Sequence, residues 1–286
     1  MGGRLLGSMA ETRDMKKQTD NKKTRRVRAA SDTERFANSR LRDGEFATAT
    51  QARRLEGQVA WVTGAGGGIG KGIACLFAAE GARVAVVERD PVTAKQTMDG
   101  IIAAGGEAIS IPCDVASEKE VKRSIEQTVS RFGSLQILAN NAGIVHVKLL
   151  HEHTEGEWDQ LMAVNVKSIF FSVKHGIAHL RRNPRSYVVN IGSISSFVGQ
   201  GSTPAYTTSK GAVLMLSKSI ALDYARDKVR CNCICPGITD TPLFRYHVNK
   251  TPDPVATLAK RLARVPLGIA LTPNDIAKAA LYFSCE

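Results

Sequence analysis

Gln58-Val-Ala-Trp-Val-Thr-Gly-Ala-Gly-Gly-Gly-Ile-Gly70 is the stretch that decides the fold of this chain. Its first six residues are largely apolar, which predicts a buried strand over 58–63. The glycines that follow lead into a helical pattern that extends through Glu80. A strand, a glycine turn and a helix in this order predict a phosphate site, because glycines let the backbone approach a pyrophosphate that faces the helix N-terminus.

Strand and helix patterns alternate along the rest of the chain. Strands are expected at 83–88, 107–112, 135–140, 187–191 and 228–235, and helices at 93–104, 118–132, 155–182, 205–224 and 273–285. This alternation predicts an α/β fold: a doubly wound parallel sheet, Rossmann-like, in a single domain. The proline-containing segment 238–272 interrupts the rhythm, and we expect it to form a lid at the carboxyl edge of the sheet.

The first 57 residues differ in composition from the rest. They hold 14 Lys/Arg and 8 Asp/Glu, which gives half of the chain's net charge of +12. We expect a basic, disordered N-terminal extension over 1–57 and a dinucleotide-binding catalytic domain over 58–286. The eight acids argue against a transit peptide. A dispensable leader and an arm that binds nucleic acid through 22–28 both fit this composition, and we do not expect nucleic acid to be a main partner.

The bulk properties exclude several other classes of protein. No run approaches the roughly 18 apolar residues that cross a bilayer, so we expect a cytoplasmic protein without a membrane partner. Cys231-Asn-Cys-Ile-Cys235 alternates as a strand does, which predicts buried strand thiols rather than a zinc site. His146, His151 and His153 are unevenly spaced in a loop. We therefore expect no metal site.

Tyr206-Thr-Thr-Ser-Lys210 places a phenol and an ammonium four residues apart on one helix face. An opposite charge nearby lowers a pKa by roughly 1–3 units, which would bring a tyrosine of pKa about 10 toward neutral pH. Tyr206 is thus a candidate acid/base. The spacing alone is weak, because Tyr-x-x-x-Lys is frequent on ordinary amphipathic helices.

Two acids follow expected strands. Glu88 ends the second strand, where a carboxylate can bind both adenosine ribose hydroxyls and repel a 2′-phosphate. It favours NAD over NADP, although Arg89 beside it weakens the argument; the alternative is a solvated strand end. Asp114, just past the third strand, can bind an adenine amino group or cap the next segment.

An ordered set of motifs gives these observations a common context. They are Thr63-Gly-x-x-x-Gly68-x-Gly70, Asn140-Asn-Ala-Gly143, Ser193, Tyr206-x-x-x-Lys210, and Pro236-Gly237 with Thr241. Over nearly all of 58–286 the chain resembles the short-chain dehydrogenase/reductase family. Each motif is weak alone, and the five in order are highly specific.

The resemblance implies a catalytic tetrad. Tyr206 matches the acid/base, and Ser193, rather than its rivals Ser195 and Ser196, matches the residue that binds the reacting carbonyl or hydroxyl. Lys210 matches the residue that binds the nicotinamide ribose and lowers the tyrosine pKa. Asn165, in Val164-Asn-Val, matches the asparagine that holds a proton-relay water to that lysine.

The resemblance also implies a set of cofactor contacts: Gly64, Gly68, Ile69, Gly70, Glu88, Asp114, Val115, Asn141, Ala142, Gly143, Tyr206, Lys210, Pro236, Gly237 and Thr241. Within this set Thr241 is expected to contact the nicotinamide carboxamide. The expected cofactor is NAD.

One departure from the family concerns the end of the sequence. Family members continue past the last helix into a seventh strand, whereas this sequence stops at Glu286. We therefore expect a C-terminally truncated domain that lacks the family's last strand. The resemblance implies a homodimer or homotetramer, and the missing strand puts the tetramer in doubt.

The implied function is an oxidoreductase that transfers a hydride between NAD(H) and a secondary alcohol or ketone. Polar residues such as His146 and Tyr246 near the expected mouth favour a sugar, polyol or cyclic hydroxy compound. A 3-oxoacyl-thioester reductase is the alternative, which NADPH preference would favour. An alternative from another class is a catalytically impaired dinucleotide-binding or regulatory protein.

Overall fold

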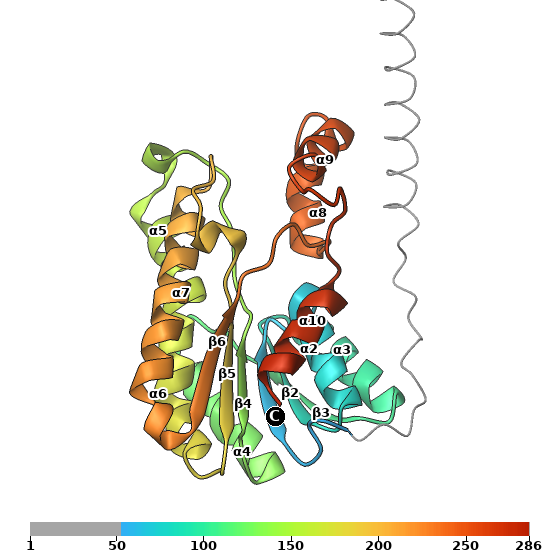
Figure 1. Cartoon of the computed structure of the whole chain (residues 1–286), viewed down its shortest axis with the longest axis vertical. Helices are drawn as coiled ribbons and strands as arrows, with labels where there is room; N and C mark the ends of the chain where they lie inside the picture. The colour runs from blue at the N-terminus through green and yellow to red at the C-terminus, as the bar shows by residue number, and fades with distance from the viewer. Residues whose placement is uncertain (1–52, 286) are drawn as a thin grey trace, which may run out of the picture.

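The computed structural model describes residues 53–285, and its centre is a parallel sheet (Figure 1). The strand order is β3-β2-β1-β4-β5-β6. The strands are β1 (Val59–Thr63), β2 (Arg83–Glu88), β3 (Glu107–Pro112), β4 (Ile137–Asn140), β5 (Ser186–Ile191) and β6 (Val229–Ile234). The predicted doubly wound sheet is confirmed. Because the order reverses between β1 and β4, the carboxyl ends of these two strands frame the expected ligand crevice.

Helices cover both faces of the sheet (Figure 1). One layer contains α2 (Gly68–Ala79), α3 (Pro91–Ala103) and α10 (Pro273–Phe283), and the other contains α4 (Glu118–Phe132), α6 (Ser168–Leu180) and α7 (Pro204–Asp223). Alternate residues of β1 divide between the layers: Ala60 and Val62 pack under α2, while Val59 and Trp61 pack under α4. The four inner strands are thus largely buried on both faces, which explains their nearly continuous apolar sequences, whereas the edge strands β3 and β6 are only partly buried.

The folded region begins earlier than the sequence suggested. Residues 1–52 of the predicted disordered extension lie outside the described residues. Residues 53–57, however, pack on the domain: Leu55 is fully buried, and the side chain of Arg54 pairs with Glu80 at 2.7 Å. Five residues of the predicted extension over 1–57 thus belong to the packed region, because a single leucine in a charged stretch carries no periodic signal.

The helix predicted over 155–182 is divided into three parts. They are α5 (Glu155–Met162), a π-helical turn η2 (Ala163–Lys167) and α6. Asn165 lies in the middle of the wide turn and is buried. A π turn inserts one extra residue per turn and re-aims the side chains within it, which is how this asparagine comes to face the site.

Segment 238–272 forms two short helices, α8 (Pro242–Asn249) and α9 (Pro254–Leu262). They lie together beyond the end of the sheet, above α10 in Figure 1. The base of the segment is held by a short pairing between Thr239 and Leu271. The segment thus consists of two short helices held at their base by one backbone pairing, and its role as a lid stays a prediction.

Candidate active site

The turn between β1 and α2 consists mostly of glycines, which carry no side chains that could block a ligand from the backbone. Helix α2 begins after Gly67 without a side-chain cap, so its first amide groups are open to an anion. Gly64 and Gly68 have φ of +62° and +52°. A Cβ on Gly70 would collide with the Gly64 carbonyl and with the Asn141 amide. The turn therefore fits the pyrophosphate of a dinucleotide.

A polar network fixes this turn to the end of β4. The Thr63 hydroxyl accepts hydrogen bonds from the amides of Asn141 and Ala142, at 3.0 and 3.1 Å. In return, the Asn141 side chain donates to the carbonyls of Thr63 and Gly64, at 2.9 and 3.2 Å. Asn141 and Ala142 thus set the separation between the two strand ends that frame the crevice.

Glu88 lies at the end of β2 beside the glycine turn. Its carboxylate accepts hydrogen bonds from the amides of Gly66 at 3.3 Å and Arg89 at 2.7 Å. A Cβ on Gly66 would lie 2.7 Å from Cγ of Glu88. The carboxylate is therefore anchored next to the turn.

Three other predicted cofactor residues lie nearby. Asp114 follows β3, and its side chain accepts from the amide of Ala116 at 2.9 Å, whereas the residue that caps the next helix, α4, is Ser117. Val115 is buried in the core under α4, and Ile69 packs in the opposite core. Val115 and Ile69 therefore support the site mainly by packing in the core.

The structure distinguishes Ser193 from its two rivals. Ser195 donates to the side chain of Gln200 at 3.0 Å, and Ser196 donates to the carbonyl of Lys210 at 2.7 Å. Ser193 instead accepts from the Ser195 amide at 3.1 Å and interacts with the phenol of Tyr206. Ser193 is thus the serine placed beside the tyrosine.

Tyr206 and Lys210 share a face of α7, but their electrostatics differ from the prediction. Burial raises the pKa of Tyr206, and its interaction with Ser193 offsets part of the increase. The Lys210 ammonium donates to the carbonyl of Ile191 at 2.7 Å and lies 5.7 Å from the centre of the tyrosine ring. The predicted lowering of the Tyr206 pKa by Lys210 is therefore wrong, because the ammonium is directed to a carbonyl and the phenol is removed from water.

Lys210 is itself perturbed by its surroundings. Only 4% of its surface is exposed, and burial lowers its pKa to about 8. Cys233 and Cys235, whose sulfurs are 3.8 Å apart, act in the opposite direction. A lysine with a pKa near 8 can hold or release a proton close to neutral pH.

Asn165 approaches the same point from η2. Its side chain accepts from the amide of Ile144 at 2.8 Å and donates to the Ile144 carbonyl at 3.0 Å and the Ser209 hydroxyl at 2.9 Å. A Cβ on Gly143 would lie 3.4 Å from Oδ1 of Asn165 and 3.5 Å from Nζ of Lys210. The bare backbone at Gly143 thus lies between the asparagine and the lysine.

Pro236, Gly237 and Thr241 close the site from the end of β6. The Pro236 carbonyl accepts from the amide of Ile194 at 2.8 Å, which links this segment to the turn that carries Ser193. The Thr241 hydroxyl caps α8. The Thr241 side chain lies 3.4 Å from the position that a Cβ on Gly68 would occupy, so the start of α8 lies beside the glycine turn.

Sequence reasoning missed a buried polar ladder behind the site. Asn140 donates to Asn190 at 2.8 Å, and Asn190 donates to Ser217 at 2.9 Å. It joins β4, β5 and α7 and so fixes α7, which carries Tyr206, against the sheet. The available signal was a polar residue at the end of each otherwise apolar strand.

The sheet order, the uncapped glycine turn and the Ser193–Tyr206–Lys210 group together define the class of α/β oxidoreductases with a dinucleotide-type fold. A family model described as short chain dehydrogenase matches residues 58–252. This chain therefore belongs to the short-chain dehydrogenase/reductase family. Among the helices of residues 53–285, none is both long and apolar enough to span a membrane.

Similar proteins include several alcohol-oxidising members of the family. A 2-(R)-hydroxypropyl-CoM dehydrogenase of Xanthobacter autotrophicus is 36% identical over 80% of this chain and 92% of its own length. An L-fucose dehydrogenase of Bos taurus is 34% identical over 82% and 85%. The crystal structure of a 3-ketoacyl-(acyl-carrier-protein) reductase from Brucella melitensis complexed with NADH has a TM-score of 0.73 and 31% identity, with 81% and 92% covered. The family and these relatives place the chain among enzymes that act on CH–OH groups.

Proposed function

We propose that this protein is an NAD(H)-dependent alcohol dehydrogenase or ketone reductase that acts on a secondary alcohol or ketone of a polyol, sugar or cyclic hydroxy compound. The observation that carries the proposal is the convergence of Ser193, Tyr206, Lys210 and Asn165, from three different elements, beside an uncapped glycine turn. Ser193 interacts with Tyr206, and Oδ1 of Asn165 and Nζ of Lys210 both lie within 3.5 Å of the position that a Cβ on Gly143 would occupy.

The residues have separate tasks in this proposal. Tyr206 transfers the hydroxyl proton, and Ser193, which already interacts with the phenol, binds the reacting oxygen. Lys210, with its lowered pKa, holds a proton behind the tyrosine, while Asn165 and Gly143 shape the space next to the ammonium. A bound nicotinamide would supply the hydride acceptor or donor.

We propose NAD rather than NADP because of Glu88. The carboxylate is fixed by two backbone amides, so it cannot easily turn away from the adenosine ribose. A 2′-phosphate there would meet a like charge.

The test is a panel of secondary alcohols, diols and sugars with NAD⁺, and of matching ketones with NADH, followed by nicotinamide absorbance. We expect turnover of at least one hydroxylated compound with NAD⁺ and weaker or absent turnover with NADP⁺. A protein that binds NAD(H) and turns over no member of the panel would instead support the regulatory alternative.

A second candidate is reduction of a 3-oxoacyl thioester. The specific observation that favours it is the likeness to the ketoacyl reductase complexed with NADH. Acetoacetyl thioesters with NADH and with NADPH therefore belong in the same panel. Turnover that is faster with these compounds than with any polyol would favour the second candidate.

A further inference from the structure

The loop between Gly143 and α5 borders the candidate active site. It begins at Gly143, beside Lys210 and Asn165. The Lys148 amide then donates to the carbonyl of Ser202 at 2.8 Å, which ties the loop to the segment that enters α7 just before Tyr206. Residues of this loop are therefore within the region where the part of a substrate away from the reacting carbon would lie.

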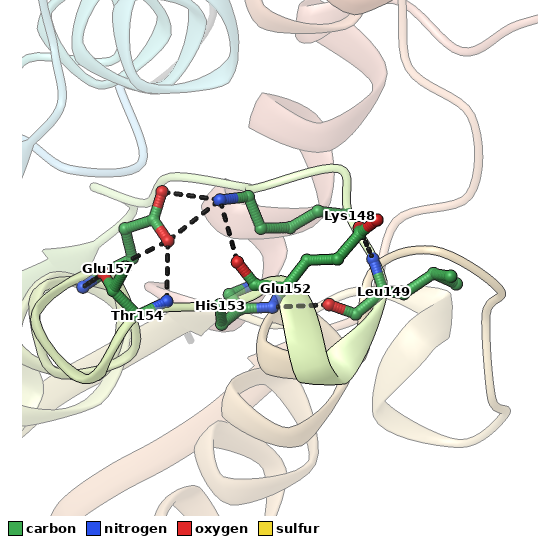
Figure 2. A network of polar contacts seen from close by, with 6 residues as sticks. All are labelled: Lys148, Leu149, Glu152, His153, Thr154 and Glu157. Carbon is green, nitrogen blue, oxygen red and sulfur yellow. Dashed lines mark hydrogen bonds and ion pairs between the residues drawn. The ribbon is translucent and has the colours of Figure 1, made fainter.

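A polar network holds the second half of the loop in one shape (Figure 2). The Lys148 ammonium contacts both carboxylate oxygens of Glu157, at 2.7 and 2.9 Å, and this hydrogen bond is the main reason why the pKa of Glu157 falls to about 2. Glu157 also accepts from the amide of Thr154 at 2.9 Å, and Glu152 accepts from the amide of Leu149 at 2.7 Å. These contacts therefore hold the loop in a fixed conformation beside the candidate active site.

His153 is fixed by this network in one tautomer. Its Nδ1 lies 3.0 Å from the carbonyl oxygen of Leu149. Since a carbonyl only accepts, Nδ1 carries the proton, and Nε2 of the neutral ring is an acceptor. That Nε2 is buried and, within the described part of the chain, has no hydrogen-bond partner. Buried polar atoms in this state are rare in folded proteins and call for a partner.

His146, whose ring lies near that of His153, also has a buried nitrogen without a hydrogen-bond partner in the described part of the chain. That nitrogen is Nδ1. The two imidazole rings are 6.1 Å apart between centres and tilted by 34°. His146 can present a donor or an acceptor, because nothing fixes its tautomer. The pair thus offers an acceptor on one ring and a donor on the other to a group between or beside them.

Helix α8 of the lid approaches this pair. The pKa of His247 is lowered by burial, then by Arg261, Lys250 and His146. His247 therefore lies near His146. Because both unpaired nitrogens are enclosed, a ligand reaches them only when a neighbouring element moves.

We propose that His146 and His153 bind a second hydroxyl group of the substrate, one that is not oxidised. A hydroxyl both donates and accepts, so it satisfies the fixed acceptor of His153 and a donor on His146. A carboxylate only accepts and cannot satisfy His153. The inference rests on the proposed function and narrows its substrate class to compounds with at least two hydroxyl groups.

The test compares a diol with the matching single alcohol. Oxidation of trans-cyclohexane-1,2-diol and of cyclohexanol is followed with NAD⁺ for the wild type, His146→Phe, His153→Phe and His151→Phe. His151 is the control because it lies in the same turn and is exposed. We expect the ratio of kcat/KM for diol over alcohol to fall about tenfold in the first two variants, which corresponds to one lost hydrogen bond, and to stay unchanged in the third.

An unchanged ratio in both His146→Phe and His153→Phe would overturn the inference. If the wild type oxidises neither compound, the proposed function fails for this substrate class, and imidazole ¹⁵N spectra still decide the binding question. Titration of the NAD-containing protein with the diol is expected to shift the ring nitrogens of His146 and His153 but not of His151, whereas cyclohexanol leaves all three in place. Equal responses to diol and cyclohexanol would refute the role of the pair.

Discussion

The glycine turn after β1 and the Ser193–Tyr206–Lys210 group after β5 lie at the same edge of the sheet but are built in opposite ways. In the turn, the working parts are backbone amides, and a side chain at Gly70 would fill the space. In the group around α7, the working parts are buried side chains, each held by a specific partner such as Ile191 for Lys210. The glycine turn therefore depends on the absence of side chains, and the group around α7 depends on side chains held in fixed positions.

This difference determines how each half fails. A substitution in the turn acts through sterics, so its cost depends on the space at that position. A substitution in the α7 group acts through charge and hydrogen bonding, so it can leave the fold intact and still remove the chemistry. The ladder from Asn140 through Asn190 to Ser217 joins β4 to α7, and Asn141, the neighbour of Asn140, is hydrogen-bonded to Thr63 and Gly64 of the turn. The separation between the two regions is therefore set by polar contacts as well as by apolar packing.

The largest effect is expected for Tyr206→Phe. The variant keeps the ring and loses only the hydroxyl, so we expect turnover to fall by about a thousandfold, within the range for loss of a general acid/base. Binding of NADH, measured by fluorescence titration, should change little. Tyr282→Phe is the matched control, because Tyr282 is on α10 and 70% exposed. Turnover of Tyr206→Phe near the wild-type level would contradict the assigned role.

The second prediction contrasts two glycines of the same turn. Gly70→Ala should destabilise the domain by about 1–3 kcal/mol, the usual cost of overpacking, because the new methyl group meets the Gly64 carbonyl. Gly67→Ala should cost much less, because a Cβ there meets nothing within 4 Å and the backbone is extended, with φ of −164°. Urea unfolding of both variants measures the difference, and equal stability would show that the turn can relax.

The glycine turn and the Ser193–Tyr206–Lys210 group also differed in how much of them the sequence could predict. The glycine turn could be predicted because glycine spacing after an apolar strand has a direct steric meaning. The identity of Ser193, Tyr206 and Lys210 could be proposed from ordered motifs, but the direction of the Lys210 ammonium could not, because it is decided by the carbonyl of Ile191 in another element. The π turn around Asn165 was equally hidden, since helical periodicity continues through it.

Lys210→Met tests how much the burial of the Lys210 ammonium lowers the free energy of unfolding. The folded pKa of Lys210, about 8, is below the usual 10.5. Between these values the unfolded chain binds more protons, so wild-type stability rises with pH there, and below pH 8 the full cost of about 3 kcal/mol is present. Methionine removes this cost but leaves the Ile191 carbonyl unpaired, which costs about 1–2 kcal/mol.

The variant should therefore be as stable as the wild type, or about 1–2 kcal/mol more stable, at pH 7, and this advantage should shrink as the pH rises toward 10. Urea midpoints at pH 7 and at pH 9.5 measure it. The exposed Lys218→Met on the same helix is the control and should show no such pH dependence. A variant clearly less stable than the wild type at pH 7 would show that the buried ammonium contributes net stability.

The smallest effect is expected for Glu88, a side chain that is hydrogen-bonded to the backbone of the glycine turn. Glu88→Gln keeps an oxygen that can accept from the Gly66 amide but removes the charge. The preference for NAD⁺ over NADP⁺, measured as a ratio of dissociation constants, should fall about tenfold, since a like-charge contact near a protein surface is worth on the order of 1–3 kcal/mol. The fall should be larger at low salt, because screening weakens the wild-type repulsion. If the ratio stays constant, the choice between NAD and NADP is made by the backbone of the glycine turn rather than by the charge of Glu88.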